Sequence, residues 1–279
     1  MISRTAGYFS HLRKLLGFRA ALIFSVYYFL YKSGTVRLKL YKIPVGPFDF
    51  YFTSVKHFAG LFMEIFFKGY YHLEKTDISL EAIDCGANIG VSLLYIKLMA
   101  PRARVKCFEP NPAALTLLNK NIEANGWQND VIVYPYALGK TKGRVEFFVD
   151  RDDASSYGAS LSKYLASRRP LNSFLVDIVC LSDYITGLID FLKIDIEGAE
   201  FDVLEDLIET NKMRDISQIQ LEHHYHPEFF KKSLDEMLKL LEGAGFQFKV
   251  RTVREPRSVS AKDQLSAYMV YAGRNKLSG

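Results

Sequence analysis

The 279-residue chain is 49% hydrophobic and 24% charged, a balance typical of a globular protein with a sizeable core. Its net charge of +5 is too small to indicate nucleic-acid binding by itself, so we expect no nucleic-acid partner. The three cysteines, Cys85, Cys107 and Cys180, have neither metal-ligand spacing nor the even number of a disulfide framework. Free thiols of this kind fit a reducing compartment, and the sequence therefore favours a cytoplasmic protein.

The N-terminal segment, residues 1–33, is expected to be helical. It contains an apolar run at Ala20–Tyr31 that follows several basic residues. The run is shorter than the ~20 residues that span a bilayer, and Lys32 follows it where a signal peptide would have a small-residue cleavage site. Two interpretations stay open: a helix packed on the protein, or a peripheral contact of residues 13–32 with the inner face of a membrane.

A hairpin and an aromatic helix are expected next. Val36–Lys42 and Phe48–Phe52 alternate apolar and polar residues on either side of a turn at Pro44–Pro47, which predicts two paired strands. Ser54–Tyr71 has the spacing of a helix, with a buried stripe at Phe58, Phe62, Ile65 and Phe66. We therefore divide the chain into an N-terminal helix and hairpin annex, residues 1–75, and a main domain, residues 76–279.

The main domain alternates strands with helices, which indicates a parallel sheet. Its seven strands are expected at Leu80–Asp84, Arg104–Phe108, Val131–Pro135, Asp190–Asp195, Ile216–Glu222, Phe246–Thr252 and Ser266–Ala272. The helices are expected at Val91–Met99, from Pro112 to Ala124, at Gly198–Glu209 and at Ser233–Leu241. An insertion after the third strand carries two further strands, Arg144–Val149 and Phe174–Cys180, around a polar loop, Arg151–Asn172.

The last two strands are joined without room for a crossover helix, so they are expected to pair antiparallel. An α/β chain with a seven-stranded, mostly parallel sheet closed by an antiparallel hairpin has the layout of the Rossmann-like class I methyltransferase fold. A dinucleotide-binding fold would continue with further strand–helix units.

The turn at Ala82–Gly90 is the first candidate site. A strand ends in Asp84, and two glycines, Gly86 and Gly90, lead into a helix, so a ligand is able to approach the backbone there. Glu109 closes the second strand nineteen residues after Gly90, where an acid accepts hydrogen bonds from ribose hydroxyls. Both NAD and S-adenosylmethionine carry that ribose. Asn88 interrupts the dinucleotide fingerprint, which disfavours NAD because no pyrophosphate cradle is evident.

A second cluster of acids follows the fourth strand. Asp195 and Glu197 are two residues apart and share one side if the strand persists. Either one is a candidate for holding a cofactor ammonium group, orienting an acceptor hydroxyl or acting as general base. Glu200 is interpreted as a first-turn helix residue favoured by the helix dipole.

Three of the six histidines lie in the run Glu222-His223-His224-Tyr225-His226, at the end of the fifth strand. In an extended segment Glu222, His224 and His226 face one way. This pattern is compatible with a catalytic or substrate-binding group, with a two-histidine, one-carboxylate metal site completed by Asp195 or Glu197, or with a polar surface loop. We assign no metal ligands from the sequence, and metal dependence stays open.

Four segments resemble the FkbM-type S-adenosylmethionine-dependent methyltransferases. They are D-C-G-A-N-I-G at 84–90, F-E-P-N-P at 108–112, Y-A-L-G at 136–139 and above all L-K-I-D-I-E-G-A-E at 192–200. The resemblance runs from about residue 71 to residue 245 and implies methyl transfer from S-adenosylmethionine to a hydroxyl of a sugar, glycan or natural product.

The resemblance also implies roles for individual residues. The methionine end of the cofactor would be lined by Asp84, Gly86, Asn88 and Gly90, the ribose by Glu109 and the adenine by Ala137 and Leu138. Asp195, Glu197 and His224 would be catalytic, with Glu222 and His223 on the substrate. Two alternatives stay open beside the O-methyltransferase: an NAD-dependent oxidoreductase and a non-catalytic, membrane-associated module on the same fold.

Overall fold

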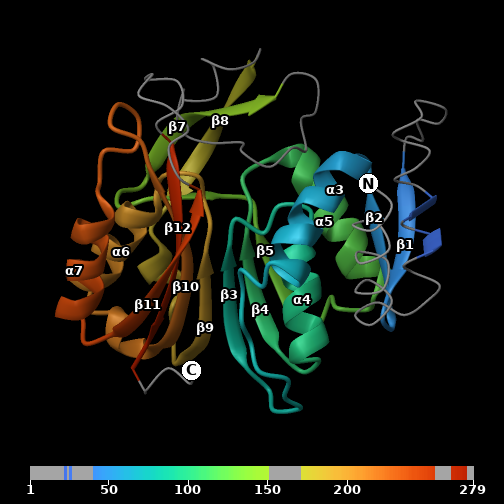
Figure 1. The fold of residues 1–279 in the computed structure, drawn as a ribbon, viewed down its shortest axis with the longest axis horizontal. Coiled ribbons are helices and arrows are strands. Elements are labelled where there is room, and N and C mark those ends of the chain that lie inside the picture. The colour runs from blue at the N-terminus through green and yellow to red at the C-terminus, as the bar shows by residue number, and fades with distance from the viewer. Residues whose placement is uncertain (1–21, 24, 27–39, 151–170, 255–264, 275–279) are drawn as a thin grey trace.

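The computed structural model describes residues 22–23, 25–26, 40–150, 171–254 and 265–274. Its centre is a seven-stranded sheet in the order β11-β12-β10-β9-β3-β4-β5 (Figure 1). The strands are β3 (Glu81–Cys85), β4 (Arg104–Phe108), β5 (Val131–Tyr134), β9 (Ile189–Ile194), β10 (Ile216–Tyr225), β11 (Gln247–Arg254) and β12 (Ser266–Gly273). β3, β4, β5, β9 and β10 run parallel, whereas β12 is antiparallel to both β10 and β11. The expected class I methyltransferase fold is therefore confirmed.

Helices cover both faces of the sheet (Figure 1). α4 (Val91–Met99) and α5 (Pro112–Ala124) lie on one face, and α6 (Glu200–Glu209) and α7 (Leu234–Gly243) lie on the other. Short 3-10 turns occupy Leu181–Tyr184 and Met213–Asp215. Because successive strand residues point to opposite faces, Ala82 joins the hydrophobic cluster of α4 and α5, while Ile83 joins that of α6 and α7.

The annex is built from a hairpin and a helix that packs on the same face as α4. β1 (Tyr41–Val45) and β2 (Phe48–Phe52) pair antiparallel, followed by α3 (Val55–Phe62) and a π-helical turn (Met63–Phe67). Residues 36–39 of the expected first strand, Val36–Lys42, lie outside the described residues. The expectation is wrong at its C-terminal end, because buried alternation continues through Ile43 to Val45. The expected helix through Tyr71 ends earlier, since Gly69 has φ +61°.

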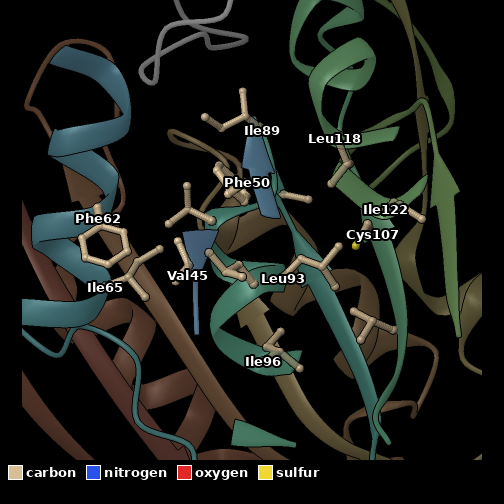
Figure 2. Close-up of a cluster of buried hydrophobic side chains, with 14 of the residues drawn as sticks. Val45, Phe50, Phe62, Ile65, Ile89, Leu93, Ile96, Cys107, Leu118 and Ile122 are labelled. Carbon is tan, nitrogen blue, oxygen red and sulfur yellow. The ribbon is translucent and has the colours of Figure 1, made fainter. Parts of the chain in front are cut away.

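Aromatic side chains join the annex to the main domain in one core. Phe52 stacks on Phe58 with ring centroids 4.3 Å apart, and Phe62 stacks on Phe66 at the same distance. These rings belong to the same buried cluster as residues of α4 and α5, such as Leu93, and Figure 2 shows Phe50, Phe62, Leu93 and Leu118 converging on it. The annex is thus continuous with the core on this face of the sheet.

The insertion forms a separate three-stranded sheet in the order β6-β8-β7. Its strands are β6 (Ala137–Leu138), β7 (Gly143–Asp150) and β8 (Leu171–Val179), and it lies beyond the upper end of the main sheet in Figure 1. β8 begins at Leu171, so the expected loop through Asn172 is wrong at its C-terminal end; residues 151–170 lie outside the described residues.

The N-terminal helix prediction, residues 1–33, falls almost entirely outside the described residues, as does the predicted membrane contact of residues 13–32. In the part of the chain that the structure describes, no helix has both the length and the apolar character needed to cross a bilayer.

Two side-chain amides on α5 bind the edge of β2 as a neighbouring strand would. The Asn121 amide accepts from the Tyr51 N–H at 2.7 Å and donates to the Tyr51 carbonyl at 3.0 Å. One turn later, Asn125 makes the same pair of bonds with Asp49, both at 2.8 Å. Asn121 also donates to the Ile89 carbonyl at 2.9 Å, so a single buried amide connects the hairpin, α5 and the glycine turn.

We expect Asn121→Ala to lower the free energy of unfolding by about 1–3 kcal/mol, because it leaves buried backbone groups without partners. Urea denaturation measures this loss. The matched control is Glu123→Gln, an exposed change on the same helix, for which a shift within about 0.5 kcal/mol is expected. Equal stability of Asn121→Ala and the control would show that the amide contributes nothing to docking the hairpin.

Candidate active site

A cavity opens at the carboxyl ends of the central strands, where ligands bind in open α/β sheets. Its lining combines the annex, the glycine turn, the ends of β4, β9 and β10 and the insertion. The lining side chains include Leu61, Glu64, Ile65, Tyr70, Tyr71, Gly86, Asn88, Glu109, Tyr136, Ala137, Leu138, Phe147, Lys193, Asp195, Glu197 and Glu222.

The glycine turn requires a residue without a side chain at its first position. Gly86 has φ +81°, and a Cβ there would lie 1.9 Å from the carbonyl oxygen of Asp195. The turn is closed by Asn88, with φ +49°, and by Gly90, the residue that precedes α4. Gly86 and Asn88 line the cavity, whereas Gly90 does not belong to its lining among the described residues.

Asp84 lies behind the cavity wall. Its side chain is fully buried and accepts from the Ser92 hydroxyl at 2.5 Å. The ammonium group of Lys193 is 3.0 Å from the other Asp84 oxygen and donates to the carbonyls of Cys85 and Gly86 at 3.1 and 2.7 Å. Asp84 therefore supports the cavity indirectly, because it binds Lys193, which in turn binds the carbonyls of the glycine turn.

Glu109, the predicted ribose acceptor, lines the cavity. Its two carboxylate oxygens accept the backbone N–H groups of Asn88 and Asn111, each at 2.8 Å, and the residue is only 5% exposed. Burial raises the pKa of Glu109 to about 7. Each carboxylate oxygen has more than one lone pair, so acceptor capacity remains for a ligand in the cavity. Ala137 and Leu138, the predicted adenine contacts, also line it.

Asp195 and Glu197 meet through a turn. The strand does not persist to these residues, since β9 ends at Ile194, so strand alternation does not decide which side they face. Glu197 has φ +57°, and a Cβ at Gly198 would lie 2.1 Å from the Phe230 ring. A non-glycine residue with positive φ stores strain, which is common at functional sites. Both residues of this strained turn line the cavity.

His224 lies under these carboxylates and contacts three acids. Its Nδ1 is 3.2 Å from Glu200 Oε1, and its Nε2 is 3.6 Å from Glu197 Oε2 and 3.7 Å from Glu222 Oε1. Burial opposes its charged form, but the facing carboxylates outweigh burial and raise the pKa of His224 well above its usual value. The facing carboxylates thus favour the charged form of His224, which offsets carboxylate charge.

The two glutamates at the rim of this cluster hold protons more tightly than usual. Burial raises the pKa of Glu197 to about 7. Burial, together with the charge of Asp195, raises the pKa of Glu222 to about 8. Glu200 behaves differently: although burial opposes ionisation, its contact with His224 and the Gly198 N–H lower its pKa.

The run of residues from Glu222 to His226 divides between two faces. Glu222 and His224 share the cavity side of β10, as expected from alternation. His223 lies on the opposite face, 2% exposed, and does not reach the cavity, although a substrate contact was expected of it. His226 does not join them: its backbone pairs with Phe230 beyond the strand, and its Nδ1 accepts the Glu228 N–H at 3.2 Å. Among the residues that the structure describes, His224 is therefore the one histidine of the cluster.

Several cavity residues lie outside the set predicted from the sequence. Three of them that carry ionisable groups are Glu64, Tyr71 and Lys193. The Tyr71 hydroxyl donates to Asp195 Oδ2 at 3.1 Å, and Glu64 reaches the cavity from the π-helical turn of the annex. The sequence does contain a signal for Lys193. A lysine inside an apolar strand that ends beside acidic residues is expected to be buried and paired with a carboxylate. The helical pattern of the annex gave no comparable signal for Glu64 or Tyr71.

Comparisons with known proteins are consistent with this site. A family model described as the methyltransferase FkbM domain matches residues 84–248. The chain is 26% identical to methyltransferase sdnD of Sordaria araneosa over 197 residues, which cover 61% of this chain and 76% of that protein. It is 28% identical to the 2-O-methyltransferase NoeI of Sinorhizobium fredii over 148 residues, 47% of this chain and 58% of that protein.

A solved structure, the methyltransferase FkbM from Methylobacillus flagellatus, aligns with 75% of this chain and 47% of its own at 18% identity and a TM-score of 0.48. The family match is the stronger finding, since it covers more than half of the chain and contains the glycine turn, Glu109 and the turn at Asp195–Glu197. The chain therefore belongs to the FkbM methyltransferase family, and its cofactor is S-adenosylmethionine.

Proposed function

We propose that this methyltransferase transfers the methyl group to a hydroxyl oxygen of a sugar, glycan or natural-product acceptor. The observation that carries the proposal is a group of carboxylates, Asp195, Glu197 and Glu222. They line the same cavity as the cofactor wall, by which we mean the residues expected to contact the cofactor, Gly86, Asn88, Glu109, Ala137 and Leu138. A hydroxyl must lose its proton when its oxygen is methylated, and a carboxylate within hydrogen-bond reach accepts it. The name of NoeI, a 2-O-methyltransferase, supports oxygen as the acceptor atom.

The cavity has separate groups for each part of S-adenosylmethionine. Glu109 carboxylate oxygens would accept from the ribose hydroxyls, Ala137 and Leu138 would contact the adenine, and the backbone of Gly86 and Asn88 would lie against the methionine end. When bound, the cofactor supplies a methyl group already activated on a sulfonium. The protein's task is then to align the acceptor oxygen and to take its proton.

The cavity wall formed by the annex favours a flat, hydroxyl-bearing acceptor. Tyr70 and Tyr71 line the cavity beside Glu64, and Phe147 lines it from the insertion. Aromatic faces pack against the apolar faces of sugar rings, while the acids around them accept hydrogen bonds from hydroxyls. The proton acceptor is Glu222 or Glu197, the two carboxylates whose burial brings their pKa near neutrality. The family match disfavours the NAD-dependent oxidoreductase.

The proposal is tested by screening sugar and natural-product alcohols with methyl-labelled cofactor and locating the label by NMR. A new methoxy group on the product is the expected result. Label on a nitrogen or carbon atom, in a product that forms at a comparable rate from these acceptors, would overturn the assignment to oxygen.

We expect Glu222→Gln and Glu197→Gln to lower kcat, with the variant that lacks the base losing about 10²–10⁴-fold. Glu222→Gln should bind S-adenosylhomocysteine as the wild type does, because Glu222 is not among the residues expected to contact the cofactor. Isothermal titration calorimetry and single-turnover kinetics separate the two effects. Full turnover in both variants would remove these carboxylates from the proposed proton transfer.

Cofactor affinity should depend on the ionisation of Glu109. Burial raises its pKa to about 7, and the ionised form is the better acceptor for ribose hydroxyls. The affinity for S-adenosylhomocysteine should therefore be constant above pH 8 and fall as the pH decreases below 7, by up to about tenfold per pH unit. Titration calorimetry between pH 5.5 and 8.5 measures the dependence.

The matched variant Glu109→Gln should bind more weakly at pH 8 and lose most of this pH dependence. If the variant keeps both the affinity and the pH profile of the wild type, Glu109 does not bind the ribose.

A further inference from the structure

Three potential metal ligands converge at the acidic end of the cavity. Asp195 and Glu197 each offer a carboxylate oxygen and His224 a ring nitrogen, and these atoms all lie within 4.8 Å of one another. Atoms bound to one cation at ~2.0–2.2 Å are separated from each other by about 3–4 Å. Asp195 and Glu197 come from the turn after β9, and His224 comes from β10. Because β9 and β10 are adjacent in the sheet, their pairing fixes the spacing of the three side chains.

The orientation of His224 points to an ion independently of the acids. Its side chain is 6% exposed, and Nε2 faces Glu197 and Glu222 at 3.6 and 3.7 Å, which are longer than hydrogen bonds. The opposite nitrogen, Nδ1, contacts the buried carboxylate of Glu200 at 3.2 Å. Metal-bound histidines are held in this way, with one nitrogen on a carboxylate and the other aimed at the ion.

Glu200 is itself fixed in place. It is 1% exposed and accepts the backbone N–H groups of Ile196 and Gly198 at 3.3 and 3.0 Å. A carboxylate bound by the same turn that carries Asp195 and Glu197 thus sets the ring of His224. The ring, the turn and the supporting carboxylate form one pre-organised unit.

The charge of the cavity leaves room for a cation. Within the described ranges, the lining carries five carboxylates, from Glu64, Glu109, Asp195, Glu197 and Glu222, and one lysine, Lys193. That lysine is paired with Asp84 at 3.0 Å. His224 offsets part of this negative charge. A bound cation would offset more of it, because grouped carboxylates in a partly buried site are costly without a compensating positive charge.

We propose that Asp195, Glu197 and His224 bind a divalent cation of the Mg²⁺ or Mn²⁺ kind. Two carboxylates with a single imidazole suit these hard cations. Copper and structural zinc sites use more imidazole or thiolate ligands. The ion would lie beside the carboxylates proposed to receive the acceptor hydroxyl, so the site would favour acceptors with two neighbouring oxygens able to bind it together.

This role rests on the proposed function. The ion makes the bound acceptor hydroxyl more acidic. Its O–H bond breaks and the proton passes to Glu222, while the oxygen forms a bond to the methyl carbon and the carbon–sulfur bond breaks, leaving S-adenosylhomocysteine. Glu197, occupied by the ion, is then a ligand, which leaves Glu222 as the proton acceptor.

The test measures Mn²⁺ binding to the full-length protein by electron paramagnetic resonance after treatment with EDTA and desalting. One saturable Mn²⁺ per chain is expected, competed by Mg²⁺. Glu197→Gln removes a ligand and Glu200→Gln frees the ring of His224, and each should weaken binding by about 10–100-fold. Glu109→Gln, an acid of the same cavity on the cofactor side, is the matched control and should bind Mn²⁺ as the wild type does.

Thermal melting checks that each variant is folded. Glu197→Gln is the substitution that packing tolerates best, because the Glu197 side chain is 28% exposed. Absence of saturable binding to the wild type, or equal binding by wild type and folded Glu197→Gln, would overturn the proposal. If the protein binds no Mn²⁺ and still methylates a hydroxyl in EDTA, the proposed ion site is overturned and the proposed O-methylation stands. Mn²⁺ binding with transfer only to nitrogen or carbon would overturn the proposed O-methylation and keep the ion site.

Discussion

A buried ion pair beneath the glycine turn is the interaction on which the cavity depends. Lys193, on β9, is 3.0 Å from Asp84, on β3, and also binds the carbonyls of Cys85 and Gly86. Removing one partner of a buried pair costs about 3–5 kcal/mol, because the other charge is left uncompensated. The pair joins the two central strands at the point where β9 passes into the acidic turn. The cofactor wall and the carboxylate cluster therefore have a fixed relation to each other.

The annex contributes to the site as well as to the core. Its hairpin is bound by Asn121 and Asn125 of α5, and its helix continues the aromatic core. This packing brings Tyr71 against Asp195 and places Glu64 in the cavity wall. The loops after β3 and β4, together with β6 of the insertion, supply the groups expected to hold the cofactor. The annex supplies much of the wall on the acceptor side. Differences in acceptor among relatives are thus expected to lie in segments outside the common sheet.

Local sequence patterns predicted most of the sheet and much of the site, because strands, helices and glycine turns have short-range signals. Arg104–Phe108 and Val91–Met99 are placed as expected, and Glu109 lies at the cavity. The errors arose where tertiary geometry decides. Asp195 and Glu197 meet through a strained turn that no periodicity reveals, Asp84 is paired by Lys193 behind the wall, and His223 turns away because β10 continues as a strand. Tyr71 reaches Asp195 across 124 residues of sequence.

The central claim is that one cavity presents the cofactor to the carboxylate cluster around His224. A crystal structure with S-adenosylhomocysteine tests it most directly. The account predicts that the ribose hydroxyls bind Glu109 and that the adenine contacts Ala137 and Leu138. It also predicts that the sulfur is directed at the side chains of Asp195, Glu197 and Glu222. A cofactor bound with its sulfur directed away from these carboxylates, or with Glu109 out of contact with the ribose, would contradict the account.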